Sequence, residues 1–171
     1  MGRFGKCRLF LITLLNIVFW LFMFYGVADI IVRLPEDFQD KAFDFRRKFY
    51  HVSEREMRFY RKIGIKSWKG KLPQHNTDFD KSHLPDVVDV PYLKKYIFIT
   101  CRAEIIHYAI AILGFLSVLF CLWEERLFFW RRVYTLIAAV IALGHTPFIL
   151  VQRYNRYRLV RLLRRKERCA E

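Results

Sequence analysis

The sequence lacks the cysteine and histidine patterns that hold a structural metal. Its four cysteines form no CxxC pair, and none has metal-ligand spacing with a histidine. No internal repeat and no low-complexity stretch is present. We therefore expect plain thiols, no metal site and a chain that is not a repeat array.

Acidic residues are also scarce. The chain has 16 Asp and Glu against 30 Lys and Arg, which gives a net charge of +14. Hydrophobic residues nevertheless make up 54% of the sequence and aromatic residues 18%. A basic chain with so much apolar side chain indicates that charged and apolar residues lie in separate segments.

Three long stretches carry no charged residue, namely 9–28 with twenty residues and 105–123 and 133–151 with nineteen each. As helices they would be about 30 Å long, which is the thickness of the bilayer hydrocarbon. The sequence therefore predicts an all-α integral membrane protein. It would have three transmembrane helices, interfacial amphipathic helices and a short polar loop.

These spans divide the chain into four segments. They are an N-terminal anchor or signal-like segment (1–28), an interfacial segment (29–104) with a loop at 65–90, a transmembrane hairpin (105–151) and a basic surface helix or tail (152–171). Segments 29–104 and 152–171 hold 24 of the 30 Lys and Arg residues. Because Lys and Arg are retained inside the cell, we expect both segments on the cytoplasmic side. A cleaved secretory signal at 1–28 is the alternative, and it would place 29–104 outside.

Local signals give several helix boundaries. Apolar residues at helical spacing predict an interfacial helix from Pro35 to Tyr50. Ser53 and Glu56 form a capping box for a second helix that would end at Gly64. Pro91 is expected to open a helix that runs into the second span.

Two ionisable residues lie where the second span begins. Glu104 and His107 are three residues apart, so they share one face of a helix. An ionisable group at this depth needs a partner, and an imidazole oriented by a carboxylate is a suitable general base. The alternative is a structural hydrogen bond between spans, with Arg102 or Arg153.

The polar loop contains further candidates for the catalytic base. His75 and Asp80 have the H-x-x-x-x-D spacing of a large class of glycerolipid acyltransferases, and His83 offers a second pair with Asp80. Solvated turn residues would give the same pattern. In the third span, His145 precedes a Thr-Pro step, where a structural role is favoured over catalysis.

Basic residues on either side of the loop and after the third span are candidates for substrate binding. Lys66, Trp68 and Lys69 combine an indole with cations, which suits anionic lipid or simple interfacial anchoring. Arg153, Asn155 and Arg156 begin a basic continuation of the third helix, which would anchor the helix or hold a phosphorylated donor or an oxyanion. Nucleic acid is not expected, because these arginines adjoin a span.

Two motifs at this spacing resemble a known family. The stretch Arg102-Ala103-Glu104-Ile105-Ile106-His107 is followed by Gln152-Arg153-Tyr154-Asn155-Arg156. Together they resemble the glycosyl-4,4'-diaponeurosporenoate acyltransferases, bacterial membrane enzymes of staphyloxanthin-type carotenoid biosynthesis. The likeness extends over roughly residues 58–168.

The resemblance implies a function. These enzymes esterify a sugar hydroxyl of a glycosylated carotenoid with a fatty acyl chain, so the acceptor would be a lipid-linked glycoside in the bacterial cell membrane. The resemblance implies functional roles for Glu104, His107, Asp80 and His83, but not for His75. No cofactor is expected beyond an acyl donor such as acyl-CoA, acyl carrier protein or phospholipid. A non-catalytic membrane adaptor for anionic lipid or a partner enzyme is the alternative from the charge alone.

Overall fold

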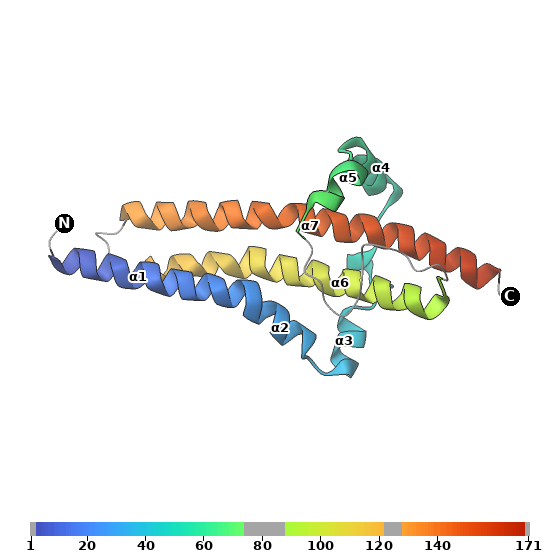
Figure 1. Ribbon diagram of the computed structural model, residues 1–171, viewed down its shortest axis with the longest axis horizontal. Helices are drawn as coiled ribbons and strands as arrows, with labels where there is room; N and C mark the ends of the chain where they lie inside the picture. Colours follow the sequence, from blue (N-terminus) through green and yellow to red (C-terminus); the bar gives the residue numbers. More distant parts are fainter. Residues whose placement is uncertain (1–2, 74–87, 122–127, 170–171) are drawn as a thin grey trace. The chain divides into compact units, whose positions relative to one another are not determined.

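The computed structural model describes residues 3–73, 88–121 and 128–169 (Figure 1). Within these ranges the chain forms helices and turns without a β-strand. The helices are α1 (Arg3–Leu21), the π-helix η1 (Phe22–Gly26), α2 (Val27–Val32), α3 (Glu36–Ala42), the 3₁₀ helix η2 (Lys48–Tyr50), α4 (Glu54–Lys62), α5 (Ile65–Trp68), the 3₁₀ helix η3 (Lys69–Lys71), α6 (Val90–Leu113), the 3₁₀ helix η4 (Gly114–Cys121) and α7 (Phe128–Arg168).

Three helical stretches are long and apolar enough to cross a membrane. They are Gly5–Val32, Val90–Cys121 and Phe128–Arg168. The predicted all-α fold with three transmembrane helices is confirmed. The predicted helical continuation of the third span is also found, because α7 runs without a break to Arg168. Pro147 lies inside α7, where its ring leaves one backbone carbonyl without its usual partner.

The described chain forms two compact units. Unit 1 comprises Met1–Pro35 and Ile105–Thr146, and unit 2 comprises Glu36–Glu104 and Pro147–Glu171. Helices α6 and α7 each contribute residues to both units. The four-segment division drawn from the sequence follows the membrane spans, whereas these units follow packing.

Unit 1 buries a small apolar core and exposes apolar side chains. Met23, Val27 and Ile110 form the buried cluster. Thr13 and Tyr134 share a hydrogen bond of 2.6 Å between their hydroxyls, which holds α1 beside α7 in this unit (Figure 1). Large apolar side chains cover the outside, as expected for a surface that faces lipid and not water.

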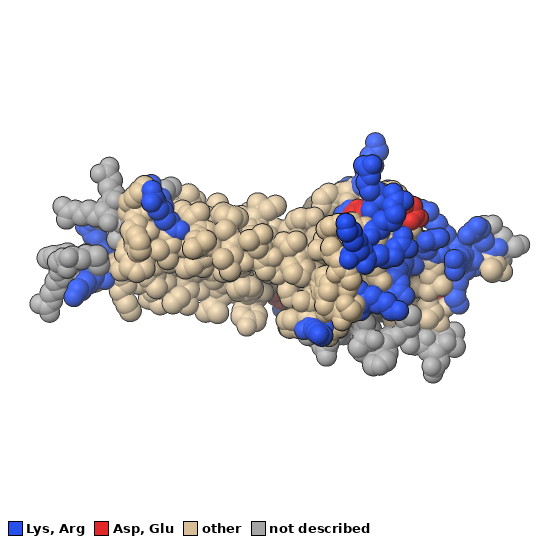
Figure 2. All heavy atoms as spheres, turned by 90° about the horizontal axis from the view of Figure 1, so that it is seen from above, with Lys and Arg blue, Asp and Glu red and all other residues tan. Residues whose placement is uncertain are grey.

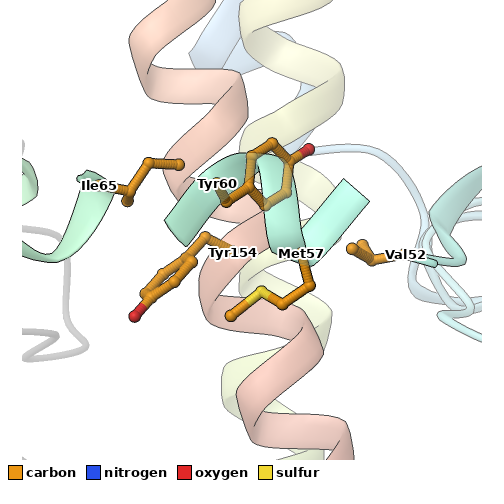
Figure 3. Close-up of a cluster of buried hydrophobic side chains, with 5 residues drawn as sticks. All are labelled: Val52, Met57, Tyr60, Ile65 and Tyr154. Carbon is orange, nitrogen blue, oxygen red and sulfur yellow. The ribbon is translucent and has the colours of Figure 1, made fainter. Parts of the chain in front are cut away.

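Unit 2 has its own apolar core, shown in Figure 3. Met57 and Tyr60 of α4, Ile65 of α5 and Val52 pack around Tyr154 of α7. Lys and Arg gather over the outside of this unit in Figure 2. The core therefore holds the short helices α4 and α5 against α7, beneath a strongly basic surface.

Several predicted helix boundaries are confirmed. The Ser53 hydroxyl accepts a hydrogen bond of 3.1 Å from the Glu56 backbone N–H, and α4 begins at the next residue. The same helix ends before Gly64, whose positive φ of 66° suits glycine. Pro91 occupies the first turn of α6, where its missing N–H costs nothing.

Two expectations for the interfacial segment were wrong. The helix expected from Pro35 to Tyr50 ends at Ala42, and a turn follows in which the Asp44 carboxylate accepts a bond of 3.0 Å from the Arg46 backbone N–H. Such an aspartate competes with helix hydrogen bonds. In the loop expected at 65–90, residues 65–71 form α5 and η3, because packing of Ile65 into the core of unit 2 stabilises a short helix there. Residues 74–87 of the expected loop lie outside the described residues.

Candidate functional site

Two histidines meet inside unit 1. The Nδ1 atoms of His107, on α6, and His145, on α7, lie 3.0 Å apart, and their ring centroids are 5.3 Å apart. The ring of Phe24 stacks on His145 at a centroid distance of 5.8 Å. His145 is buried, with 7% of its surface exposed, and His107 is partly buried.

A hydrogen bond between the Nδ1 atoms of two neutral rings determines which Nε2 atom carries a proton and which carries a lone pair. A neutral imidazole has one N–H donor and one acceptor nitrogen. In a pair of neutral rings, the ring that donates from Nδ1 carries its lone pair on Nε2, and the ring that accepts at Nδ1 carries its proton on Nε2. The pair therefore presents one basic nitrogen and one N–H donor, which are the two groups that proton transfer requires.

Glu104 has partners other than the predicted histidine. Its carboxylate is fully buried in unit 2 and accepts a hydrogen bond of 2.9 Å from Arg153 and another from Arg156. Arg156 is 1% exposed. Glu104 thus makes the structural contact with Arg153 that was the alternative prediction. A catalytic role for Glu104 stays a prediction.

The two arginines also hold the segment before α4. Arg153 donates to both carboxylate oxygens of Glu56, at 2.5 and 3.1 Å, and to the backbone carbonyls of Phe49 and His51. Arg156 donates from Nε to the backbone carbonyl of Tyr50 at 3.0 Å. These bonds tie α4 and η2 to α7 and balance two guanidinium groups with two carboxylates.

The acid groups of this network respond to their surroundings. Burial opposes ionisation of Glu56, but hydrogen bonds from Arg153 and Tyr60 outweigh it and hold the pKa of this carboxyl below its ordinary value. Burial and the bond to Glu56 raise the pKa of the Tyr60 hydroxyl. Glu56 is thus kept as an anion that pairs with Arg153.

The structure joins two of the predicted substrate-binding residues. Lys69 Nζ donates a bond of 3.0 Å to the Asn155 side-chain oxygen, and it lies 5.6 Å from the centroid of the Tyr154 ring. Burial, followed by the positive charge of Arg158, lowers the pKa of Lys69. A cation that is half-buried beside another cation favours an anion nearby, which suits the predicted role in substrate binding.

The other predicted binding residues lie apart from this contact. The Trp68 indole donates to the Ile63 carbonyl at 3.1 Å, which closes the turn between α4 and α5, and Lys66 is exposed. Arg102 donates to the Gln39 side chain at 3.3 Å and faces the Phe98 ring. Roles in substrate binding for these three residues stay predictions.

Asp80 and His83, and with them His75, lie outside the described residues. Their predicted roles therefore stay predictions. In the ranges that the structure describes, no group of three or more His, Cys, Asp or Glu side chains is arranged to hold a metal ion.

The partner of His107 was the main omission of the sequence analysis. His145 was treated as structural, because it was considered alone beside Pro147. A signal was available: antiparallel packing of the second and third spans brings residues at equal distances from the hairpin to one depth. Counting from that turn places His107 and His145 within about one helical turn of each other.

Comparison with known proteins agrees with the resemblance noted above. Residues 45–165 match the family described as glycosyl-4,4'-diaponeurosporenoate acyltransferase. Proteins of that name from Staphylococcus aureus strains N315 and MRSA252 are 30% and 31% identical to the chain over 160 residues, covering 90% of this chain and 89% of each relative. No solved structure matches the chain. The prediction of an acyltransferase is thus confirmed at the level of the family, and the chain belongs to the glycosyl-4,4'-diaponeurosporenoate acyltransferase family.

Proposed function

We propose that the protein transfers a fatty acyl group to a hydroxyl of a glycosylated carotenoid or a related glycolipid in a bacterial cell membrane. Family membership supports acyl transfer, and the names of the relatives supply the glycosylated carotenoid. The hydrogen bond of 3.0 Å between His107 and His145 is the observation that carries the proposal. It supplies a base and a proton donor within an apolar span, where a membrane-resident acceptor lies.

His107 acts as the base in this proposal, with His145 as its positioning residue. Donation from His107 Nδ1 to His145 Nδ1 leaves the lone pair on His107 Nε2. This nitrogen takes the proton of the acceptor hydroxyl while the hydroxyl oxygen attacks the acyl carbonyl. A new ester C–O bond forms, the bond from the acyl carbon to the donor breaks, and the proton passes to the leaving thiolate or alkoxide.

The donor is an acyl-CoA, an acyl carrier protein or a phospholipid, and basic residues of unit 2 bind its anionic part. The charge asymmetry supports a cytoplasmic location for unit 2, which carries 23 of the 30 Lys and Arg residues. A soluble phosphorylated donor is available on that side. The proposal requires no metal.

Conservative substitutions of the two histidines test this mechanism. Asparagine retains hydrogen bonding but does not take up a proton, so His107→Asn should lower ester formation by about 10²-fold or more. His145→Asn still offers a carbonyl to His107 and should retain activity within about tenfold of the wild type. Ester product is measured by lipid mass spectrometry of proteoliposomes that contain the acceptor and an acyl donor.

Folding controls and a clear negative result accompany this test. Thr135 is exposed in the same unit, and Thr135→Ala removes only a hydrogen bond to the preceding turn of α7, so it should leave turnover unchanged. All variants are compared for membrane insertion and elution as a single species. Full turnover by a well-folded His107→Asn protein would remove His107 from the mechanism.

A non-catalytic adaptor would be insensitive to these histidine changes. Replacing Arg153 or Arg156 by Lys keeps the charge but removes bidentate binding, so an adaptor should tolerate the change and a guanidinium site should not. This is nevertheless a weaker test. Both arginines hold buried carboxylates, so lysine would weaken the fold under either hypothesis. The histidine variants therefore discriminate better.

A further inference from the structure

Unit 2 contains a hollow of about 410 Å³, and Arg156 is the one predicted site residue among those that line it. Its walls come from the turn after α3, from the start of α4 and from the last part of α7. The volume is within the range of about 300–1,000 Å³ that is typical of small-molecule sites. It is therefore large enough for part of a substrate.

Arginine dominates the charge of this hollow. Arg46, Arg156, Arg161 and Arg164 line it, and Glu54 is the one carboxylate among its lining residues. Glu54 already accepts a hydrogen bond from the Tyr157 hydroxyl. The lining thus carries a surplus of positive charge.

Two of the four arginines are not neutralised by a carboxylate among the described residues. Arg46 is paired with Asp44 and Arg156 with Glu104. In contrast, Arg161 and Arg164 are exposed and form no ion pair with any carboxylate that the structure describes. They lie three residues apart on α7, so they point from the same face of the helix.

The remaining walls indicate what kind of anion fits. Arg161 donates to the Tyr157 hydroxyl at 3.2 Å and lies over that ring, so its guanidinium group is held in place. Guanidinium groups bind phosphate oxygens in a bidentate manner, and several together favour a multiply charged anion over a single carboxylate. Phe45, Tyr50 and Tyr157 add aromatic surface beside the cations.

We propose that this hollow, through Arg161 and Arg164, binds the phosphate groups of the acyl donor. The proposal rests on the function proposed above and adds the group by which the donor is recognised and the place where it is held. Two sources offer this chemistry: the phosphorylated nucleotide end of coenzyme A and the headgroup of an anionic phospholipid. In either case the site recognises phosphate and not the acyl chain.

Direct binding to the full chain tests the site without requiring turnover. Adenosine 3',5'-bisphosphate, the nucleotide end of coenzyme A, is titrated into protein in phosphatidylcholine nanodiscs and followed by calorimetry. Arg161→Gln and Arg164→Gln should each weaken binding by about tenfold or more, as expected for loss of a charge-assisted hydrogen bond. Arg165→Gln is the matched control, because Arg165 is exposed on the same helix but does not line the hollow. It should change affinity by no more than about threefold, because a charge that does not contact the ligand is screened by salt.

A second arm identifies the source of the phosphate. Nanodiscs that also contain phosphatidylglycerol are analysed by native mass spectrometry for lipid retained by the protein. Retention that is lost in Arg161→Gln and Arg164→Gln but kept in Arg165→Gln supports the site with a phospholipid as the source. If neither probe binds, or if Arg165→Gln weakens binding as much as the other two changes, the proposal is overturned.

Activity measurements separate this site from the proposed reaction. If the binding pattern holds but the wild type forms no ester with any donor, the acyl-transfer mechanism fails and the phosphate site stands. If ester forms and the KM for the donor is the same in the Arg164→Gln and Arg165→Gln proteins, the site fails and the reaction stands. Both arginines are exposed, so these variants should fold as the wild type does.

Discussion

Units 1 and 2 bury polar groups in different ways. Unit 1 joins polar side chains in pairs, with His107 beside His145 and Thr13 beside Tyr134. Unit 2 instead buries a carboxylate, Glu104, and balances it with arginine. Seven of the 30 Lys and Arg residues belong to unit 1 and 23 to unit 2. The fully buried carboxylate thus lies in the unit that supplies its counter-charges, because an unpaired ion in apolar surroundings is very costly.

The largest expected effect comes from removing the buried carboxylate of unit 2. Glu104→Ala leaves Arg156 buried without its carboxylate, and breaking a buried ion pair in this way costs about 3–5 kcal/mol. We expect a large fall in the thermal unfolding midpoint in detergent and poor recovery of monodisperse protein. The control is Glu167→Ala, which breaks an exposed pair with Lys94 and should cost less than about 1 kcal/mol. Equal effects of the two changes would contradict the assignment of Glu104 as the central ion of unit 2.

Unit 1 should be most sensitive to steric change. A Cβ at Gly114 would overlap the Trp20 ring, so Gly114→Ala forces the indole to move, at a cost of about 1–3 kcal/mol. Gly144 is the matched control in the same unit, because a Cβ there meets no atom within 4 Å among the described residues. Gly144→Ala should be neutral or stabilise the helix by up to about 1 kcal/mol.

The unfolding midpoint in detergent measures both glycine changes. If Trp20 is the obstacle, Trp20→Leu should restore much of the stability that Gly114→Ala removes. A loss that persists in the double variant would show that the close approach of the indole is not the cause.

A smaller effect should depend on pH and belong to unit 2 alone. The pKa of Glu56 is depressed in the folded protein, so its ion pair with Arg153 stabilises the fold above the unfolded pKa, and that stability is lost as the pH falls through the folded pKa. Glu56→Gln should therefore lower the free energy of unfolding near neutral pH by roughly 1 kcal/mol, in view of the partial exposure of Glu56. This change is measured as a lower unfolding midpoint. The gap between the two proteins should shrink as the pH falls below 4.5, the ordinary pKa of the group. A gap that stays constant over this range would mean that Glu56 does not act through its charge.

Local signals predicted local structure well. The Ser53 cap, the stop at Gly64 and the start at Pro91 depend on neighbours within one or two helical turns, and all three are found. The expected helix to Tyr50 was wrong because the side chain of Asp44 competes for the backbone of the turn. The helix at Ile65 was missed because its stability comes from a core assembled by distant residues.

Candidate residues were easier to recognise than their partners. Glu104 and His107 stand out as ionisable groups where an apolar span begins, and Arg153 follows another span. A shared helix face gave the expected pairing of Glu104 with His107. The structure instead has the alternative partner of Glu104, Arg153 of α7, since an arginine offers a buried carboxylate a full counter-charge and a bidentate fork. His107 pairs with His145 of α7, which was not expected.

The sequence alone determined the membrane spans, the segregation of charge and the family, because these follow from composition and from short motifs along the chain. Only the tertiary structure decided which partner each buried polar group has. A side chain on a helix meets the element that its face happens to contact, and that depends on how each helix is rotated about its axis. Rotation is set by the packing of whole cores, such as the one around Tyr154, and not by the spacing of two residues.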